Sequence, residues 1–365
     1  MALSTTPSGS GALKSGSIKV IIAGKSDIVC KPILASLKTV PEVDIVAQVP
    51  TGTLAASRLK QDHADVVVMD IGMPELDGLK AIPRLLLANP DIKIVMVATL
   101  TFRNVKISMD GFVAGAVEFV TLPVSRNKKS VDSKFQLELT SKIKALGSVS
   151  RRPVAERKVA PAKRADSSLR APSSQRPDII GIGASTGGPR VLISFFEKLP
   201  NLGSQAILVT QHMPASFMAQ MADHIAKAGE WTCTLAKDGE VIKAGHVYLA
   251  PGDLHMTVTG SSIVKRIRLT DDPPVNYCRP AVDPMFKSIA QVYGNRALGV
   301  IFTGMGKDGL AGSRDIVEAG GTIVSQDEES SVVWGMPAAI ADAGLSSKID
   351  TPEALLQFIV ELARK

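Results

Sequence analysis

A serine among glycines, directly after an apolar run, is the first feature of this chain that could do chemistry. Residues 181–189 are GIGASTGGP, and residues 183–187 within them have the pattern G-x-S-x-G, with Ser185 at its centre. A sharp turn from a strand into a helix exposes such a serine beside backbone N–H groups that can hold an oxyanion. The pattern alone also fits a structural turn, because tight turns need small residues.

Two further residues favour a catalytic role for Ser185 over a purely structural turn, because they also follow apolar runs. His212 follows the run 206–210, and Asp308 follows the run 297–304. Neighbouring parallel strands bring residues at their carboxyl ends to one edge of the sheet, within hydrogen-bonding reach. There His212 could take the proton of Ser185, and Asp308 could orient the imidazole and stabilise its protonated form. The chain order Ser, His, Asp differs from that of α/β-hydrolases, in which the acid precedes the histidine.

A glycine-rich turn can also bind a dinucleotide, but two features disfavour that alternative. The spacing is G-x-G-x-x-x-G-G instead of G-x-G-x-x-G, and the next strand ends in Gln211 and His212 instead of an acid that could hold a ribose.

Within the hydrolase interpretation, His255 could line the site, and Asp253 and Asp283 are alternative orienting acids. The remaining histidines are expected in surface, core or strand positions without a catalytic role: His63, His224 and His246.

The three cysteines are odd in number and far apart, which offers neither a disulfide framework nor a metal-finger spacing. Cys30, Cys233 and Cys278 are therefore interpreted as small buried hydrophobes in a reducing compartment. No apolar run is long enough to span a bilayer, and the polar N-terminus lacks the apolar centre of a signal peptide. These observations predict a cytoplasmic protein without membrane insertion.

The net charge of +7 is concentrated in one segment. Residues 148–178 carry eight basic and three acidic residues, hence five of the seven net charges, and contain almost no large apolar side chains. Such a composition predicts a solvated linker. A nucleic-acid-binding face would instead need the excess charge on a folded surface with aromatic or groove-reading side chains, so no nucleic-acid partner is expected.

On either side of this linker, short apolar runs alternate with amphipathic helical patterns, which predicts two α/β domains. The N-terminal runs predict a doubly wound, five-stranded parallel sheet: 18–23, 43–49, 65–69, 92–98 and 116–120. The C-terminal half begins in the same way, but the segments 246–250, 256–260 and 262–269 follow one another without helices and predict an antiparallel excursion. The expected organisation is a disordered tail at 1–16, a first domain at 17–147, a linker at 148–177 and a catalytic domain at 178–365.

Several ordered motifs in the C-terminal half carry a specific resemblance: GIGASTGGP, VTQHMPASF, LAPGDLHM, PAVDPMF, FTGMGKDG and SQDEESSVVWGMP. Together they resemble the catalytic domain of CheB, the bacterial chemotaxis protein-glutamate methylesterase and glutaminase. The resemblance implies Ser185 as nucleophile, His212 as general base and acid, and Asp308 as the orienting acid. It further implies that Thr186 and Met305 help to form the oxyanion site. No metal or organic cofactor is implied for catalysis.

The resemblance also implies a reaction and its partners. The reaction is hydrolysis of methylated glutamates on methyl-accepting chemotaxis receptors, with release of methanol and deamidation of certain glutamines. Two other hypotheses remain open. One is a non-enzymatic scaffold that kept the fold, and the other is an esterase acting on a different carboxyl ester.

The N-terminal segment 65–78, DVVVMDIGMPELDG, resembles a response-regulator receiver, with Asp70 at the phosphoacceptor position. Receivers carry an acidic pair that helps to bind Mg²⁺, a hydroxyl residue that ends the fourth strand and a lysine before the proline after the fifth. The matching positions here are occupied by other residues: Gly24, Lys25, Ala98 (with Thr99 one residue late) and Leu122. A single carboxylate is a poor Mg²⁺ site. We therefore expect no bound Mg²⁺ and a degenerate receiver that works as a fixed interaction or inhibitory module. A histidine kinase or another regulatory protein is the candidate partner of this domain.

Overall fold

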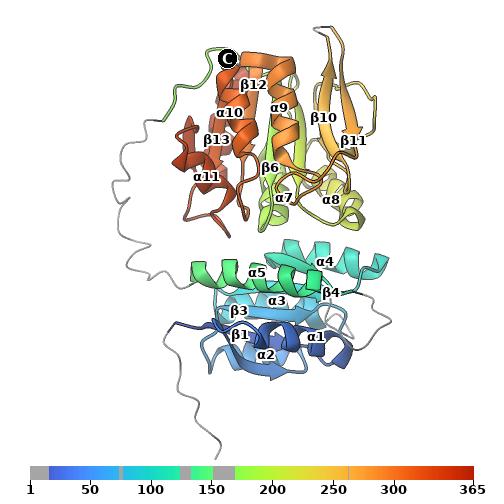
Figure 1. The fold of residues 1–365 in the computed structure, drawn as a ribbon, viewed down its shortest axis with the longest axis vertical. Helices are drawn as coiled ribbons and strands as arrows, with labels where there is room; N and C mark the ends of the chain where they lie inside the picture. The colour runs from blue at the N-terminus through green and yellow to red at the C-terminus, as the bar shows by residue number, and fades with distance from the viewer. Residues whose placement is uncertain (1–15, 74–76, 124–132, 151–168, 262) are drawn as a thin grey trace, which may run out of the picture.

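The computed structural model describes residues 16–73, 77–123, 133–150, 169–261 and 263–365. Figure 1 shows two α/β units, one above the other. The predicted tail lies outside the described residues except for Gly16, and so does the stretch 151–168 of the predicted linker. Among the described residues, no helix combines the length and the apolarity that crossing a bilayer requires.

The N-terminal unit is a five-stranded parallel sheet in the order β2-β1-β3-β4-β5, as its apolar runs predict. Its strands are β1 (Ile18–Ala23), β2 (Val43–Val49), β3 (Val66–Asp70), β4 (Lys93–Ala98) and β5 (Glu118–Thr121). Its helices are α1 (Asp27–Lys38), α2 (Gly52–Leu59), α3 (Asp77–Ala88), α4 (Phe102–Ala114) and α5 (Ser133–Ser150). Alternate residues of β1 point to opposite faces, so Val20 packs with α1 and α5 while Ile21 packs with α2, α3 and α4.

The C-terminal unit is built on a seven-stranded sheet in the order β14-β13-β12-β6-β7-β9-β8, and all its strand pairs are parallel. The strands are β6 (Ile179–Ala184), β7 (Ala206–Gln211), β8 (Thr232–Leu235), β9 (His246–Leu249), β12 (Ala297–Ile301), β13 (Thr322–Gln326) and β14 (Lys348–Asp350). The antiparallel hairpin of β10 (His255–Gly260) and β11 (Lys265–Thr270) stands apart as a second sheet.

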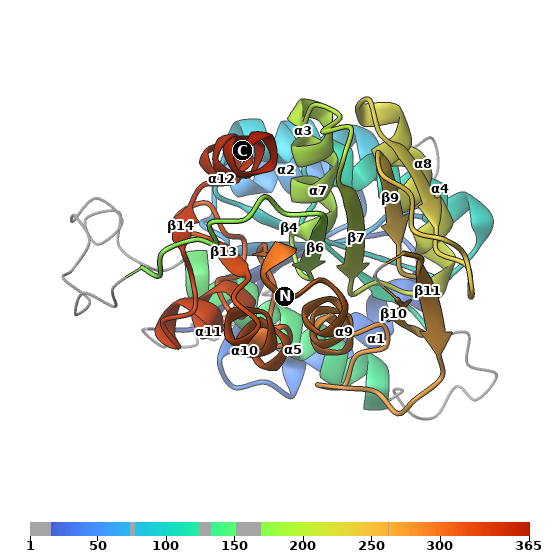
Figure 2. The ribbon, with the colours of Figure 1, turned by 90° about the horizontal axis from the view of Figure 1, so that it is seen from above.

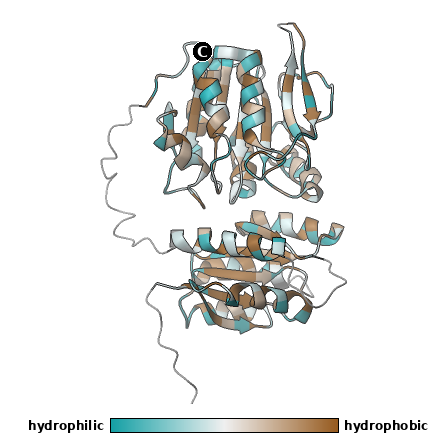
Figure 3. Ribbon diagram, in the orientation of Figure 1, coloured by the Kyte–Doolittle hydropathy of each residue, from teal (hydrophilic) through white to brown (hydrophobic). Residues whose placement is uncertain are grey.

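Helices cover both faces of the seven-stranded sheet. Figure 2 shows α7 (Gly188–Lys198), α8 (Ala215–Ala228) and α12 (Pro352–Arg364) on one side. On the other side lie α9 (Val282–Tyr293), α10 (Leu310–Glu318) and α11 (Met336–Asp342). A 3₁₀ turn, η2 (Gly294–Arg296), follows α9. The strands are brown with apolar residues in Figure 3, whereas the helices mix teal and brown, as expected for strands buried between two helical layers.

One part of the predicted antiparallel excursion was wrong. The segment 246–250 contains β9, which pairs in parallel with both β7 and β8, whereas only the two following segments form the antiparallel hairpin. The connection from β8 to β9 is a crossover of residues 236–245 without a helix. Because a helix usually marks a parallel crossover in the sequence, its absence favoured the antiparallel interpretation.

Close packing of α9 brings the loops beside it to the carboxyl edge of the sheet. A Cβ on Gly181 of β6 would lie 2.8 Å from Ile289 and 2.9 Å from the Phe286 ring, so a glycine is needed at this position. The start of α9 thereby reaches the turn after β12, where the Val282 N–H donates to Asp308.

Residues 169–177, within the predicted linker, lie along the C-terminal unit. The Arg170 N–H donates to the Ser346 carbonyl at 3.0 Å, and the Ser173 N–H donates to Thr322 Oγ1 at 2.8 Å. At the other end of the linker, α5 continues to Ser150, three residues beyond the predicted domain boundary.

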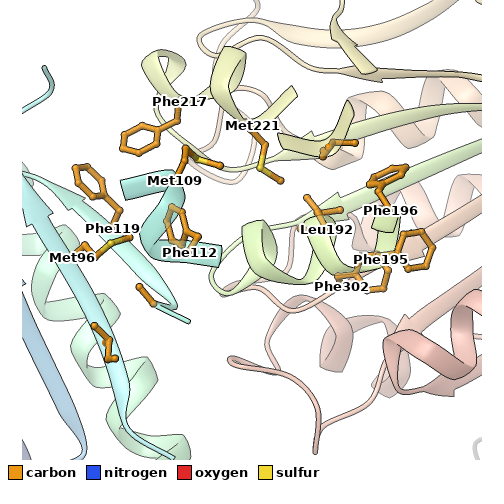
Figure 4. Close-up of a cluster of buried hydrophobic side chains, with 14 of the residues drawn as sticks. Met96, Met109, Phe112, Phe119, Leu192, Phe195, Phe196, Phe217, Met221 and Phe302 are labelled. Atoms are coloured by element: carbon orange, nitrogen blue, oxygen red, sulfur yellow. The ribbon is translucent and has the colours of Figure 1, made fainter. Parts of the chain in front are cut away.

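The two units meet where α4 packs on α7 and α8, and where side chains of β5 contact α8 and the turn before α7. Phe119 of β5 and Phe217 of α8 point toward one another in Figure 4, with ring centroids 4.7 Å apart. Met109 and Phe112 of α4 and Met221 of α8 belong to the same buried cluster. The carboxyl end of β6, where Ser185 follows, points toward the N-terminal unit (Figure 1).

Candidate active site

Ser185 lies on a tight turn between β6 and α7, as its motif predicts. Its N–H donates to the Thr303 carbonyl at 3.1 Å, and its own carbonyl accepts the Gly188 N–H at 2.8 Å. Gly187 has a φ of +81°, in the left-handed region that favours glycine, and caps α7. The turn leaves Ser185 half-buried at the N-terminus of α7.

Gln211, the last residue of β7, joins this turn to the neighbouring strand. Its amide Nε2 donates to the carbonyls of Ser185 and His212, both at 3.0 Å. A Cβ on Gly188 would lie 2.1 Å from Gln211 Oε1, so only glycine leaves room for this amide. In the sequence, Gln211 shows only that no acid ends this strand. Its structural role could not be predicted, because the two groups that accept its hydrogen bonds are backbone carbonyls.

His212 and Asp308 are in direct side-chain contact, so the structure brings these two predicted residues together. Nε2 of His212 lies 2.8 Å from Oδ2 of Asp308, and their side chains are 12% and 2% exposed. The carboxylate also accepts the N–H groups of Val282 at 2.6 Å and Gly309 at 3.0 Å. Such a network holds the imidazole in one orientation.

Electrostatics in this buried pair favour the charged forms. Burial alone would lower the pKa of His212, but the hydrogen bond to Asp308, followed by the contact with Cys278, raises it to about 10. For Asp308, burial works toward a higher pKa, but the hydrogen bond and charge of His212 together with backbone N–H groups hold the pKa below its ordinary value. Both shifts favour an imidazolium facing a carboxylate.

Ser185 stands at the same edge as this pair but is not hydrogen-bonded to it. Ala184 is in register with Gln211, so Ser185 and His212 are the next residues of two adjacent parallel strands. Within the described part of the chain, no hydrogen bond joins the serine hydroxyl to the imidazole. Nδ1 of His212 instead lies 3.5 Å from Sγ of Cys278. Cys278, predicted as a buried hydrophobe, is thus a half-exposed residue at the site, whereas Cys30 and Cys233 are buried.

The two residues predicted at the oxyanion site also lie next to Ser185. Thr186 is buried, and its hydroxyl donates to Oε2 of Glu118 in the N-terminal unit at 2.7 Å. Met305 is 42% exposed and follows Gly304, where a Cβ would lie 2.8 Å from the Ser185 Cβ. The neighbouring Gly187 N–H is occupied by the Val117 carbonyl of the N-terminal unit at 3.1 Å.

His255, considered as a residue lining the site, has a structural place instead. It is buried, with Nε2 3.2 Å from the Pro273 carbonyl and Nδ1 accepting the Ala281 N–H at 3.2 Å. These contacts support the loop that carries Cys278.

Asp283, an alternative orienting acid, accepts the Gly312 N–H at 2.8 Å and contacts Asn276 rather than His212. The N–H of Asp253 donates to the Arg279 carbonyl, and no contact joins its described side chain to the imidazole.

The other histidines stay outside the site. His63 is exposed beside Asp65, and the ring of His246 lies 5.2 Å from that of Tyr248. His224 of α8 lies 3.6 Å from Asp110 of α4, so it takes part in the contact between the two units.

Asp70 ends β3 of the N-terminal unit, as predicted. It is buried, which raises the pKa of its carboxyl despite a hydrogen bond from the Gly72 N–H at 2.8 Å. A Cβ on Gly24 would lie 2.9 Å from Cys30 Sγ and 3.1 Å from the Asp70 Cβ, so an acidic side chain has no room there.

The positions around Asp70 at which receivers carry functional side chains differ in this chain. Lys25 is exposed, whereas Ala98 and Leu122 are buried and apolar, so none of these three side chains supplies an oxygen ligand. Thr99, one residue late for the sensing hydroxyl, has its Oγ1 accepting from the Asn104 amide at 3.3 Å.

Two family models match the two units of this fold. The model of the CheB methylesterase matches residues 180–359, and that of the response regulator receiver domain matches residues 20–129. A crystal structure of the CheB methylesterase catalytic domain from Thermotoga maritima is 36% identical with a TM-score of 0.50, and the match covers 51% of this chain and 98% of that one.

Full-length relatives extend the similarity over both units. The protein-glutamate methylesterase/protein-glutamine glutaminase 1 of Rhodospirillum rubrum is 41% identical over 99% of both chains. The enzyme of that name from the group 2 operon of Rhodospirillum centenum is 42% identical over 95% of this chain and 94% of the other. Fold and sequence thus define a receiver-coupled hydrolase. The chain belongs to the CheB family of protein-glutamate methylesterases and protein-glutamine glutaminases.

Proposed function

We propose that this protein removes methyl esters from glutamate side chains of chemotaxis receptors, releases methanol, and deamidates receptor glutamines. The observation that carries the proposal is the buried His212–Asp308 pair at the sheet edge, one strand from the serine turn. The names of the full-length relatives supply the substrate class.

In the proposed mechanism Ser185 is the nucleophile. Its Oγ attacks the ester carbonyl while Nδ1 of a neutral His212 takes the proton, and Asp308 stabilises the resulting imidazolium through Nε2. His212 then gives the proton to the departing methoxide, so methanol leaves and an acyl-serine remains. Water, activated by the same imidazole, releases the glutamate. An amide takes the same path with ammonia as leaving group, and every step uses only side chains, backbone and water.

The developing oxyanion needs donors beside Ser185, and we assign them to the turn that follows it. The backbone N–H of Thr186 has no acceptor among the described contacts and lies at the positive end of α7. The Thr186 hydroxyl and the chain around Met305 complete this side of the site. In this structure the Thr186 hydroxyl faces the N-terminal unit, and Met305 is exposed.

The N-terminal unit is proposed as a fixed inhibitory module. Its Val117 carbonyl and Glu118 carboxylate accept hydrogen bonds from Gly187 and Thr186, which places receiver groups where a receptor side chain would enter. Because the functional positions of a receiver differ around Asp70, we expect a binding partner to move this module instead of phosphorylation. A histidine kinase or another signalling protein is the proposed partner.

The proposed domain boundaries remain 17–147 for the receiver-like unit, 148–177 for the linker and 178–365 for the catalytic unit. The hydrogen bonds of Arg170 and Ser173 with the catalytic unit support a linker whose last part runs along that unit.

Comparing two substrates tests the proposed specificity. Methanol release is measured from membranes with methylated receptors and from a small carboxylic methyl ester at the same ester concentration. The proposal predicts clearly faster release from the receptors. Equal rates would favour an esterase of another specificity, and no release from either would favour the non-enzymatic scaffold.

A further inference from the structure

His212 has a neighbour that the proposed mechanism does not use. Nε2 of the imidazole is held by Asp308, so Nδ1 is the ring nitrogen left to accept the proton of Ser185. The Cys278 Sγ lies 3.5 Å from that nitrogen. The thiol therefore contacts the ring nitrogen that the serine hydroxyl has to reach in the proposed mechanism.

Neither protonation state of His212 leaves Nδ1 free for Ser185 while Cys278 is in contact with it. If the imidazole is neutral, the thiol S–H donates into the only lone pair of Nδ1. If the imidazole is charged, its Nδ1–H points to the sulfur of Cys278, and an imidazolium has no lone pair to offer Ser185. In both cases the Cys278 contact has to be released before Ser185 can be activated.

The turn that carries Cys278 is tied to the same carboxylate as His212. Val275 and Cys278 bond each other in both directions, at 3.1 and 2.9 Å. Between them Asn276 and Tyr277 have φ values of +51° and +64°, the pattern of a tight two-residue turn. The Asn276 amide donates to Oδ1 of Asp308 at 3.1 Å and to Oδ2 of Asp283 at 2.9 Å. These bonds fix the thiol beside the imidazole, so the contact belongs to the architecture of the site.

We propose that Cys278 is a positioning residue that holds the imidazole of His212 in a resting arrangement, away from Ser185, until substrate binding displaces the thiol. This inference rests on the proposed function, in which Ser185 is the nucleophile. It accounts for the missing hydrogen bond between Ser185 and His212, although the two residues follow adjacent strand ends.

The charges around the imidazole agree with this assignment. Two described titratable groups contact His212: Asp308 from the turn after β12, and Cys278 from the turn 275–278. Asp283 of α9 lies behind Asp308. Burial would lower the pKa of His212, but Asp308 and, next, Cys278 raise it. Without Cys278, the pKa of the imidazole should fall, and more of it should be neutral at a given pH.

The first test compares the kinetics of full-length Cys278→Ala and Cys278→Ser with those of the wild type. For Cys278→Ala we expect kcat/KM for methanol release to rise about fivefold, the effect of losing one competing hydrogen bond. The gain should come from a lower KM with kcat nearly unchanged, because bound substrate has already displaced the thiol in the wild type. The acidic limb of the pH profile of kcat/KM should move to lower pH. Cys278→Ser keeps a donor to Nδ1 and should stay near the wild type. Cys233→Ala, at a buried cysteine on β8, is the matched control. An unchanged or lower kcat/KM, or an unmoved profile, in Cys278→Ala would overturn the proposal.

The second test does not depend on activity. Iodoacetamide alkylates Cys278 when the thiol releases its proton to water, the sulfur bonds to the methylene carbon and iodide leaves. Held beside a positively charged imidazole, Cys278 should be alkylated faster in the wild type than in His212→Gln at the same pH, with Cys278→Ala as the background. Equal rates in the two proteins would refute the pairing. If even the wild type releases no methanol, the proposed function fails while this comparison still decides whether the thiol and imidazole are paired.

Discussion

At the scale of single residues, the site depends on a buried charged pair that the fold stabilises from several sides. Asp308 accepts hydrogen bonds from His212, Val282 and Gly309, and each one favours its ionised form. The carboxylate in turn favours the imidazolium. The pair is therefore suited to stabilise the charge that appears on His212 during catalysis, provided that the imidazole first loses its resting proton.

This coupling predicts how His212 contributes to stability as pH changes. Its pKa in the folded chain, about 10, lies above its ordinary value of 6.5, so its stabilising contribution is complete below the ordinary value and is lost as pH rises through about 10. The difference in free energy of unfolding between wild type and His212→Gln should therefore shrink steadily over that window. Urea unfolding of both proteins at pH 6, 8 and 10.5 measures it. A difference that stays constant over this range would contradict the raised pKa.

At the scale of elements, parallel strands bring together the residues that define the site. Ser185, His212 and Asp308 each follow a strand of one sheet, so apolar runs and strand-end residues were enough to predict them. Cys278 could not be predicted in this way. It lies in a loop between β11 and α9, and its position depends on bonds from Asn276 and His255 to distant residues. Likewise, the parallel pairing of β9 reflects a choice of partner strands, which local sequence does not encode.

The turn between β6 and α7 gives a prediction at this scale. In Gly188→Ala, the new Cβ would meet Gln211 Oε1 and Ala184 Cβ, at 2.1 and 2.8 Å, and would displace the amide that joins the Ser185 and His212 carbonyls. We expect a loss of about 1–3 kcal/mol in stability and a lower kcat. The control is Gly203→Ala, whose Cβ would meet no atom within 4 Å at a φ of +72°. It should cost stability through backbone strain alone and leave kcat intact. A lower kcat in both variants would argue against a specific role for Gln211.

At the scale of the whole molecule, two α/β units share one buried apolar cluster, and the contact ends at the serine turn. Phe119 packs on Phe217, and the next residue toward the N-terminus, Glu118, reaches Thr186. The other carboxylate oxygen of Glu118 lies 3.1 Å from Lys142 of α5, which also pairs with Glu138. The receiver-like unit thus touches the site with a glutamate side chain, the product that the proposed reaction would form.

Glu118 and Glu138 provide a matched pair of variants for testing inhibition. Both carboxylates pair with Lys142, but of the two only Glu118 is described in contact with the catalytic unit. Glu118→Ala should raise methanol release from receptors about tenfold, the effect of losing one charge-assisted hydrogen bond from the closed arrangement. Glu138→Ala should leave the rate near that of the wild type, and acetyl phosphate with Mg²⁺ should neither label Asp70 nor raise the rate. Equal rates for the two variants, or an activating label on Asp70, would contradict a fixed inhibitory module.

The most direct test of the central claim is methanol release from methylated receptor membranes by the full-length wild type and by Ser185→Ala. Removing a nucleophile whose base and orienting acid remain in place should lower the rate by about 10⁴-fold or more. The melting temperature of the variant should stay close to that of the wild type, because the described contacts of Ser185 are made by its backbone. A folded Ser185→Ala protein that still releases methanol near the wild-type rate would show that this serine is not the nucleophile.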